Sequence, residues 1–340
     1  MGNIASFPNL NNANEPVHIP VMLEEVLTIL SPSTNKTYVD ATYGSGGYSK
    51  KILSSAKCKL IAIDRDPDAY ANAEKESLEW KGRLVAVCGC FGDLEQLLNS
   101  EGIKSNSIDG VIMDLGVSSV QLCNPVLGFS FSSDGPLDMR MSRFGQTAAD
   151  VINTFSEQEI ADILYKLGGE RYSRRIARRL VKARSDEPIL RTKQLADIVS
   201  SALPREHRNK RGSISIHPAT RSFQAIRIYV NDEINELRRG LVAAEKVLAP
   251  KGRLIVVSFH SLEDREVKQF FSQRSGKDSR VSRHIPINAQ KERLPSFLLP
   301  KRKLTEPSDS EVTRNPRARS AKLRYAIRTE ASPWGMGVIA

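Results

Sequence analysis

The chain of 340 residues is long enough to bury a sizeable core and to form two domains. It contains no apolar run long enough to cross a bilayer, which excludes a helical membrane protein. Residues 1–16 are polar and lack the apolar core of a signal peptide, so we expect a flexible tail on a cytoplasmic protein. The net charge of +11 favours a polyanionic partner such as a nucleic acid.

The four cysteines, Cys58, Cys88, Cys90 and Cys123, do not have the spacing of a disulfide framework. Cys88 and Cys90 also lack the second pair of ligands that a structural zinc site needs. We therefore expect buried free thiols and no bound metal ion.

The first third of the chain alternates between short apolar runs and amphipathic helices. An extended lead-in and a first helix occupy residues 17–30. We then expect strands at residues 37–41, 59–63, 83–87 and 108–113, and helices at residues 48–55, 66–80 and 93–99. Such alternation is typical of a parallel sheet with right-handed crossovers.

The alternation stops at residues 116–143, a long segment of glycine, serine and proline of the kind that usually carries function. Helices without strands are expected next, at residues 147–153, 156–167, 170–184 and 191–203. A helix, a strand and another helix then follow at residues 219–248, 253–258 and 261–274. The remainder, residues 275–340, is charged and interrupted by prolines.

This pattern predicts an α/β fold with a doubly wound, mostly parallel sheet and an inserted all-α domain. We assign residues 17–123 and 218–330 to the discontinuous sheet domain and residues 124–217 to the helical insertion. The insertion carries the most basic helix, so we expect it to recognise a nucleic acid.

A cluster of glycines follows the first predicted strand. Gly44, Gly46 and Gly47 come just after Asp40 and open the next helix. Glycine allows positive φ and a close approach of the backbone to a ligand, and a helix start offers free N–H groups. The spacing is not that of a phosphate-binding loop. Acid before glycines, with a second acid after the next strand, resembles the class I methyltransferases that bind S-adenosylmethionine, so we expect Gly44, Gly46, Gly47 and Tyr48 to bind the methionine and ribose parts of that cofactor.

Acidic residues also end the next strands. Asp64 closes the second strand, at the distance where an acid accepts hydrogen bonds from ribose hydroxyls. Asp114 closes the fourth strand and is placed to hold an ammonium group or to face a reacting amine. Phe91, after the third strand, is placed to cover an adenine. Each acid alone has the simpler interpretation of an exposed strand end, but the ordered set favours a binding site.

A basic helix is predicted at residues 170–184. Its arginines Arg174, Arg175, Arg178 and Arg179 recur at spacings that place like charges side by side, which is destabilising unless phosphates neutralise them. The alternative is a solvated charged face.

A further candidate, His260, lies just past the strand at residues 253–258, where it can assist proton removal or stack on a base. Ser261 and Asp264 beside it have the spacing of a helix capping box.

With these segments in view, the chain resembles the bacterial 16S ribosomal RNA cytosine-N4 methyltransferase family, also called MraW. The motifs that carry the resemblance lie, in the family's order, at residues 18–23, 40–49, 114–122, 135–141, 218–228, 258–265 and 315–324. The resemblance implies a class I methyltransferase fold, S-adenosylmethionine as methyl donor, and one cytosine in the decoding region of small-subunit RNA as acceptor.

The resemblance also implies site residues. The family's cofactor contacts fall on Gly46, Gly47, Tyr48, Asp64, Phe91, Asp114 and Gln121, of which only Gln121 is not reached from the residue pattern itself. The family often has His in place of Tyr48. The segment at residues 114–119 replaces the Pro-Pro signature of other amino-methyltransferases, so Asp114, Ser118 and His260 are the catalytic candidates.

Candidate RNA contacts are Arg140 and Arg221, in addition to the arginines of the basic helix. The expected partner is 16S ribosomal RNA or the small ribosomal subunit, and a homodimer is one alternative for the assembly. Three other functions stay open: a DNA amino-methyltransferase, a non-catalytic nucleic-acid-binding protein with a nucleotide fold, and an NAD-dependent enzyme. Asp40 before the glycines does not fit the NAD fingerprint.

Overall fold

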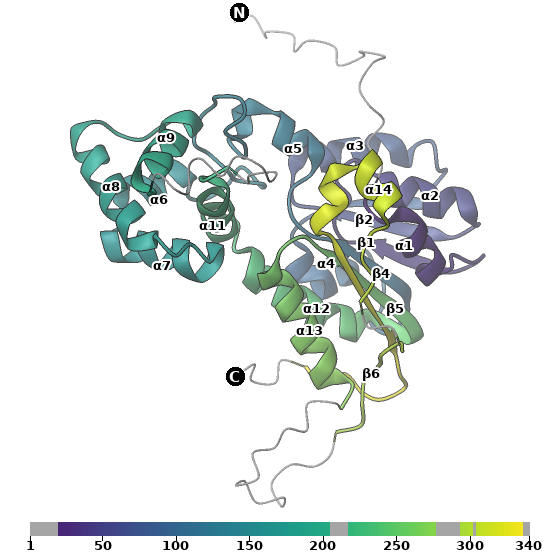
Figure 1. The fold of residues 1–340 in the computed structure, drawn as a ribbon. Helices are drawn as coiled ribbons and strands as arrows, with labels where there is room; N and C mark the ends of the chain where they lie inside the picture. The colour runs from purple at the N-terminus through teal and green to yellow at the C-terminus, as the bar shows by residue number, and fades with distance from the viewer. Residues whose placement is uncertain (1–19, 205–216, 277–292, 302–303, 336–340) are drawn as a thin grey trace, which may run out of the picture.

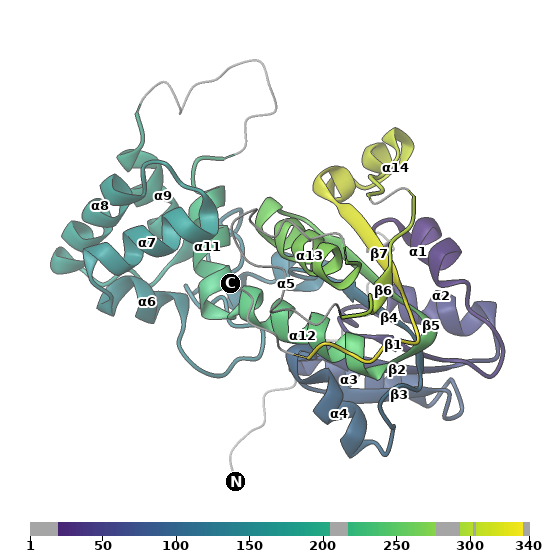
Figure 2. The same cartoon turned by 90° about the horizontal axis from the view of Figure 1, so that it is seen from below.

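The computed structural model describes residues 20–204, 217–276, 293–301 and 304–335. In this part of the chain a sheet covered by helices lies beside a separate group of helices (Figures 1 and 2). The predicted tail at residues 1–16 and the first two residues of the motif at 18–23 lie outside the described residues.

The sheet has seven strands in the order β3-β2-β1-β4-β5-β7-β6. Their bounds are β1 (Thr37–Asp40), β2 (Lys59–Asp64), β3 (Leu84–Cys88), β4 (Ile108–Asp114), β5 (Leu248–Ser258), β6 (Phe297–Leu298) and β7 (Lys322–Arg328). Strands β1 to β5 are parallel, whereas β7 runs antiparallel to both β5 and β6. This confirms the predicted doubly wound, mostly parallel sheet.

Helices cover both faces of the sheet, because successive strand residues point to opposite sides. Ile61 belongs to the apolar cluster beneath α4 (Leu94–Ser100), α12 (Glu233–Val247) and α13 (Ser261–Arg274). Its neighbour Leu60 belongs to the cluster beneath α1 (Leu23–Leu30), α2 (Gly47–Ser55) and α3 (Pro67–Ser77). Buried on both faces, these strands read as continuous apolar runs.

The register of the strands brings the predicted acids to one edge. Asp40 of β1 is level with Ala62 of β2 and with Ile112 of β4. Asp40, Asp64 and Asp114 therefore end three adjacent parallel strands at the same edge. The strand order reverses between β1 and β4, and ligands bind at such a switch point in open α/β sheets.

The second group of helices shares one apolar core. It contains α6 (Ala148–Thr154), α7 (Glu157–Gly168), α8 (Ser173–Asp186), α9 (Thr192–Ala202) and α11 (Thr220–Val230). Helix α11 packs tightly on the end of α7, since a Cβ at Gly168 would lie 2.6 Å from the carbonyl oxygen of Arg221. By this packing α11 belongs with the helical group, although it follows the domain boundary predicted at residue 217. The division into two domains remains a prediction.

The prediction of a single long helix at residues 219–248 is wrong. The chain forms α11 and α12 instead, because Asp232 between them takes a left-handed conformation with φ of 50°. Buried Asn231 holds this break against the long segment before the helical group. Its side-chain Nδ2 donates to the carbonyl of Met139 at 2.7 Å, and its Oδ1 accepts from the N–H of Met141 at 2.8 Å.

Regular structure also appears where the sequence shows no periodicity. The segment at residues 116–143 contains α5 (Ser119–Cys123) and the 3-10 turn η2 (Pro125–Leu127). The charged C-terminal part contains β6, α14 (Asp309–Arg314), the turn η4 (Pro316–Ser320) and β7. The sequence analysis does not predict strand β7, because arginines and a lysine between its apolar residues make the segment look like a charged loop.

The cysteines are all free, but the prediction that they are buried holds only for Cys58. Cys88 and Cys123 are exposed and Cys90 is half-buried. None of the helices in the described ranges combines the length and the apolar character that crossing a bilayer requires.

The role of Asn231 predicts a stability effect. Asn231→Leu should lower the free energy of unfolding by about 2–4 kcal/mol, because a buried carbonyl and a buried N–H lose their partner. Asn235→Leu, on the exposed side of α12, should change it by less than about 0.5 kcal/mol. Urea titrations measure both; equal effects would contradict the assignment.

Candidate functional site

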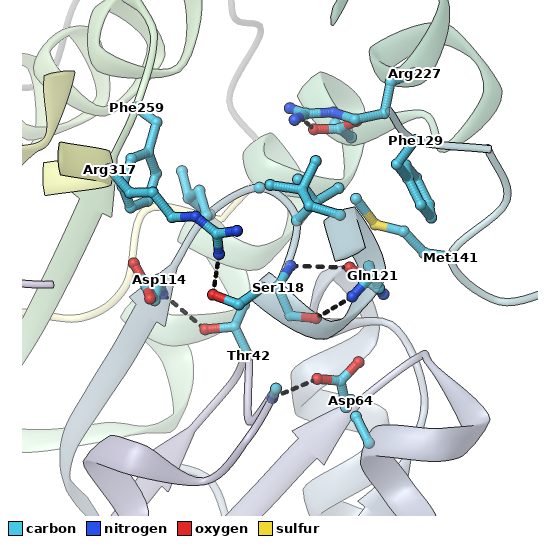
Figure 3. A pocket seen from close by; sticks show the side chains of 18 of the residues that line it. Thr42, Asp64, Asp114, Ser118, Gln121, Phe129, Met141, Arg227, Phe259 and Arg317 are labelled. Carbon is cyan, nitrogen blue, oxygen red and sulfur yellow. Dashed lines mark hydrogen bonds and ion pairs between the residues drawn. The ribbon is translucent and has the colours of Figure 1, made fainter. Parts of the chain in front are cut away.

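A cavity of about 510 Å³ opens at the carboxyl edge of the sheet. The segments that follow β1, β2, β4 and β5 form its floor, and residues of α11, α12 and the segment at 116–143 form its walls (Figure 3). It has the size of a small-molecule site. The predicted cofactor and catalytic residues that line it are Gly44, Gly47, Tyr48, Asp64, Phe91, Asp114, Ser118, Gln121 and His260.

The glycine loop brings the backbone close to its neighbours. Gly46 has a φ of 75°, and a Cβ there would lie 2.5 Å from the hydroxyl oxygen of Tyr43. A Cβ at Gly47 would lie 2.2 Å from the ring of Pro20. Gly46 itself does not line the cavity. The lack of a side chain at Gly46 instead allows the loop to pass close to Tyr43. Tyr48 is buried and its hydroxyl donates to the carbonyl of Val21, which ties the loop to the lead-in segment.

Asp64 organises the floor of the cavity. Its Oδ2 accepts from the N–H of Gly44 at 2.8 Å, and its Oδ1 accepts from the N–H of Asp66 at 2.9 Å. Burial raises the pKa of Asp64 to about 6, although these N–H groups act in the opposite direction. Asp40 does not line the cavity and lies below it, fully buried, where the hydroxyl of Ser49 donates to it at 2.7 Å.

Asp114 faces the cavity with an incomplete set of partners. Its backbone N–H donates to Thr42 Oγ1 at 2.7 Å, but its side-chain Oδ1 is buried without a hydrogen-bond partner. Burial raises the pKa of Asp114 well above its usual range, and the negative charges of Asp40 and Glu263 act in the same direction. A buried carboxyl group in this state is stabilised by any cation or N–H donor that enters the cavity.

Gln121 and Ser118 form the capping box of α5. Ser118 Oγ accepts from the N–H of Gln121 at 3.2 Å, and Gln121 Oε1 accepts from the N–H of Ser118 at 2.9 Å. Gln121 Nε2 also donates to Asp66 Oδ2 at 2.7 Å, which joins α5 to the start of α3. This network fixes the edge of the cavity between Asp64 and Asp114.

Phe91 lies in the turn η1 (Phe91–Asp93) after β3 and presents its ring to the cavity. Its other side packs on α12, where a Cβ at Gly240 would lie 2.5 Å from the ring. A flat apolar surface at this position suits an adenine, as the sequence predicts.

His260 caps the N-terminus of α13, so the prediction of Ser261 as the cap of this helix is wrong. His260 Nδ1 accepts from the N–H of Glu263 at 3.3 Å, and Glu263 Oε2 accepts from the N–H of Phe259 at 2.8 Å. His260 Nε2 is buried and lies 3.1 Å from Glu263 Oε1, so the imidazole and this carboxyl group interact directly.

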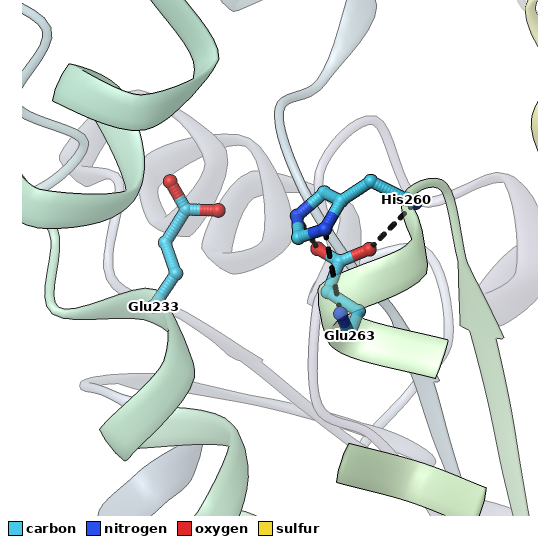
Figure 4. A group of neighbouring side chains, drawn as sticks. All are labelled: Glu233, His260 and Glu263. Carbon is cyan, nitrogen blue, oxygen red and sulfur yellow. Dashed lines mark hydrogen bonds and ion pairs between the residues drawn. The ribbon is translucent and has the colours of Figure 1, made fainter. Parts of the chain in front are cut away.

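Glu233, His260 and Glu263 lie close enough to share a metal ion (Figure 4). Both oxygens of Glu233, however, accept from Arg227 at 2.8 Å. The pKa of Glu263 is lowered, since the hydrogen bond and charge of His260 and the charge of Arg227 outweigh its burial. We interpret the cluster as a charge network that joins α11 and α12 to α13.

The charges around the cavity are divided unequally. Arg65 pairs with Glu236, and Arg227 pairs with Glu233. Among the lining residues outside these two pairs, the acids are Asp64, Asp114 and Glu263. The arginine outside these two pairs is Arg317. The floor is therefore negative, which suits a positively charged small molecule that also carries hydroxyl groups.

None of the predicted RNA contacts lines the cavity. Arg174, Arg175, Arg178 and Arg179 are exposed on α8, and Arg221 is exposed on α11. Arg140 is engaged within its own segment, where it makes a two-point ion pair with Asp138 and donates to the carbonyl of Gly145 at 3.0 Å. Its charge is therefore largely neutralised.

The sequence interpretation missed several residues of the site. Thr42 lies inside the recognised motif at 40–49, and its contact with Asp114 depends on strand register. Arg227 lies inside the recognised motif at 218–228, and its partner Glu233 lies outside the motifs on the next helix. Arg317 lies in the basic C-terminal motif, but only the pairing of β7 with β5 brings it to the cavity.

Comparisons with known proteins give a consistent result. A sequence profile of the MraW methylase family matches residues 15–329. The chain is 53% identical over 317 residues to the ribosomal RNA small subunit methyltransferase H of Hyphomonas neptunium, which covers 93% of this chain and 90% of the relative. It is 51% identical over 326 residues to the protein of the same name from Rhodospirillum rubrum, covering 95% and 97%. A solved SAM-dependent methyltransferase from Aquifex aeolicus has a TM-score of 0.38 and 8% identity, covering 91% and 90%.

The raised pKa of Asp64 predicts a pH-dependent affinity for S-adenosylmethionine. If Asp64 binds the ribose hydroxyls as the sequence predicts, its carboxylate form is the better acceptor, so affinity should fall as the pH drops through about 6. Between pH 7 and pH 5 the wild type should lose up to about tenfold more affinity than Asp64→Asn, whose side chain does not titrate.

Isothermal titration at several pH values measures this difference. The matched control is Asp162→Asn, on the exposed side of α7, which should follow the wild type. An Asp64→Asn protein that keeps the full wild-type pH dependence would exclude Asp64 as its source.

Proposed function

Because the chain belongs to the MraW methylase family, we propose that it methylates 16S ribosomal RNA with S-adenosylmethionine as methyl donor. The acceptor that we propose is the exocyclic N4 of one cytosine in the decoding region of the small ribosomal subunit. Its curated relatives carry the name ribosomal RNA small subunit methyltransferase H. We place the activity in the cytoplasm, where ribosomal subunits are assembled.

The observation that carries this proposal is the negative floor beside the glycine loop. S-adenosylmethionine has sulfonium, ammonium and carboxylate groups, a ribose and an adenine, and the residues described above fit its cationic groups, its ribose and its adenine. Asp114, with its buried unpaired Oδ1, suits either the ammonium group of the cofactor or the amine that receives the methyl group. Asp64 suits the ribose hydroxyls, and Phe91 suits the adenine ring.

The reaction requires help at the acceptor nitrogen. The lone pair of cytosine N4 is delocalised into the ring, so N4 attacks well only when an acceptor draws on its N–H. The bound cofactor supplies an activated methyl group. We assign the role of proton acceptor to Asp114. Its carboxyl group is desolvated, and its raised pKa makes the carboxylate a better proton acceptor near neutral pH.

Positioning supplies the rest of the rate. Holding two reactants in line lowers a barrier by up to about 7–11 kcal/mol in favourable cases. The network of Ser118, Gln121 and Asp66 fixes the loop beside Asp114. His260 lines the cavity just after β5, and Leu115, which follows β4, donates its N–H to the carbonyl of Val257 in β5 at 2.9 Å.

The target base must leave its stack to reach the cavity. Three aromatic residues of the helical group, Phe129, Phe131 and Phe223, line the cavity wall opposite the strand ends. Phe131 and Phe223 pack edge to face with ring centroids 4.9 Å apart. We propose this apolar wall as the surface that receives the unstacked base.

The exposed arginines of α8 fit a second, remote contact with the RNA. Ile176, Ala177 and Leu180 are buried on one side of α8, so the arginines project from the other. Of these arginines, Arg178 has an ion pair, with Glu157 at 3.5 Å. We propose that α8 contacts phosphates of the folded RNA, with Arg221 nearer to the cavity.

A substitution at Asp114 tests the proposed chemistry. Asp114→Asn should lower kcat on small subunits by about 100-fold or more, because the asparagine amide is a poor proton acceptor. Affinity for S-adenosylmethionine should change less. The matched control, Asp109→Asn, alters the opposite end of the same strand and should leave turnover unchanged.

Turnover with labelled cofactor and affinity by titration separate the outcomes. Full turnover with normal affinity would exclude Asp114 as the acceptor. A loss confined to affinity would assign Asp114 to the cofactor's ammonium group. Comparable transfer to DNA in the same assay would favour the alternative of a DNA amino-methyltransferase.

A further inference from the structure

Arg317 is the arginine at the cavity that forms no ion pair with a carboxylate within the described part of the chain. It lines the cavity mouth, and it is exposed. Its guanidinium donates to the hydroxyl of Ser119 and contacts the sulfur of Cys123 at 3.9 Å. Both partners are neutral, in contrast to the carboxylates that hold Arg65 and Arg227.

The C-terminal segment holds Arg317 in this place. Strand β7 pairs antiparallel with β5, and Lys322 is level with Ser258 at the carboxyl edge of the sheet. The turn η4 that precedes β7 is anchored by Ala318 and Ala321, which are buried in the apolar core. The backbone is therefore fixed at the mouth while the side chain of Arg317 extends over it (Figure 3).

Two further arginines flank Arg317. Arg314 at the end of α14 and Arg319 in η4 are exposed, and no ion pair holds either of them in the described part of the chain. The buried acid of this segment, Glu311, is occupied by the N–H of Met22 and does not compensate them. The mouth thus carries Arg317 above a negative floor, and two more exposed arginines lie on the same segment; we call these three arginines the rim.

This arrangement of charge identifies the ligand. A small cationic cofactor is attracted to the floor, whereas an anion is attracted to the rim. When a base enters the cavity, the phosphate attached to its sugar stays outside at the mouth. A guanidinium is the side chain best shaped to hold a phosphate with two parallel hydrogen bonds.

We propose that Arg317 binds an RNA phosphate next to the target nucleotide, with Arg314 and Arg319 holding the adjoining backbone. The proposal rests on the proposed function in that the nucleic acid is the methylated RNA. It separates two roles: the C-terminal rim holds the nucleotide at the cavity, and α8 holds a distant part of the same RNA. In both views α14 and α8 lie at opposite sides of the molecule (Figures 1 and 2).

The separation of the two surfaces makes the test specific. A short RNA hairpin that contains the target cytosine reaches the rim but does not extend to α8. Arg317→Gln should weaken binding of this hairpin about 10- to 100-fold, the effect of losing a charged hydrogen bond. It should also reduce the slope of log affinity against log salt by about 0.7–0.9.

Two control proteins complete the design. Lys59→Gln removes an equal charge at the opposite, amino edge of the sheet, where Lys59 is exposed, and should bind the hairpin like the wild type. A variant with Arg174, Arg175, Arg178 and Arg179 all changed to Gln should bind the hairpin normally but lose affinity for small subunits. Fluorescence anisotropy of the labelled hairpin measures binding without requiring turnover.

The outcomes are distinct. Unchanged hairpin affinity and salt slope in Arg317→Gln would overturn the proposal. A weakened affinity for S-adenosylmethionine, with normal hairpin binding, would also overturn it by assigning Arg317 to the cofactor's carboxylate. Absence of methyl transfer by the wild type would instead refute the proposed function, and the anisotropy comparison would still decide the role of Arg317.

Discussion

The structure depends on acidic side chains gathered at one edge of the sheet without enough cations to neutralise them. The parallel register of β1, β2 and β4 brings Asp40, Asp64 and Asp114 to this edge. Burial raises the pKa of each of them, because it disfavours the charged form of each carboxyl group. Such shifts are typical of a site built for a ligand of opposite charge.

Segments far apart in the sequence complete the site around these acids. The lead-in segment is tied to the glycine loop by Tyr48 and to α14 by Glu311. Asn231 fixes the junction between the helical group and α12, so the aromatic wall stays opposed to the strand ends. The C-terminal strand β7 brings Arg317 to the mouth. The cavity is consequently a joint product of the sheet, the helical group and both ends of the described chain.

The sequence was sufficient for the five parallel strands and for the acids at their ends, because apolar runs that end in acids are local patterns. Asp64 and Asp114 were predicted and line the cavity. The break at Asp232 was not predicted, since one left-handed residue leaves no periodic signal. The contact of Thr42 with Asp114 and the position of Arg317 depend on pairing between distant strands. The cap of α13 was misplaced by one residue because histidine is an unusual cap.

The central claim is that the acids at the sheet edge serve methyl transfer from S-adenosylmethionine to one cytosine N4. The most direct measurement incubates the protein with labelled cofactor and small ribosomal subunits that lack the modification, followed by mass spectrometry of nucleosides and RNA fragments. The account predicts a single N4-methylated cytidine in the decoding region. A methyl group on another atom or another base, or no transfer to subunits despite cofactor binding, would contradict it.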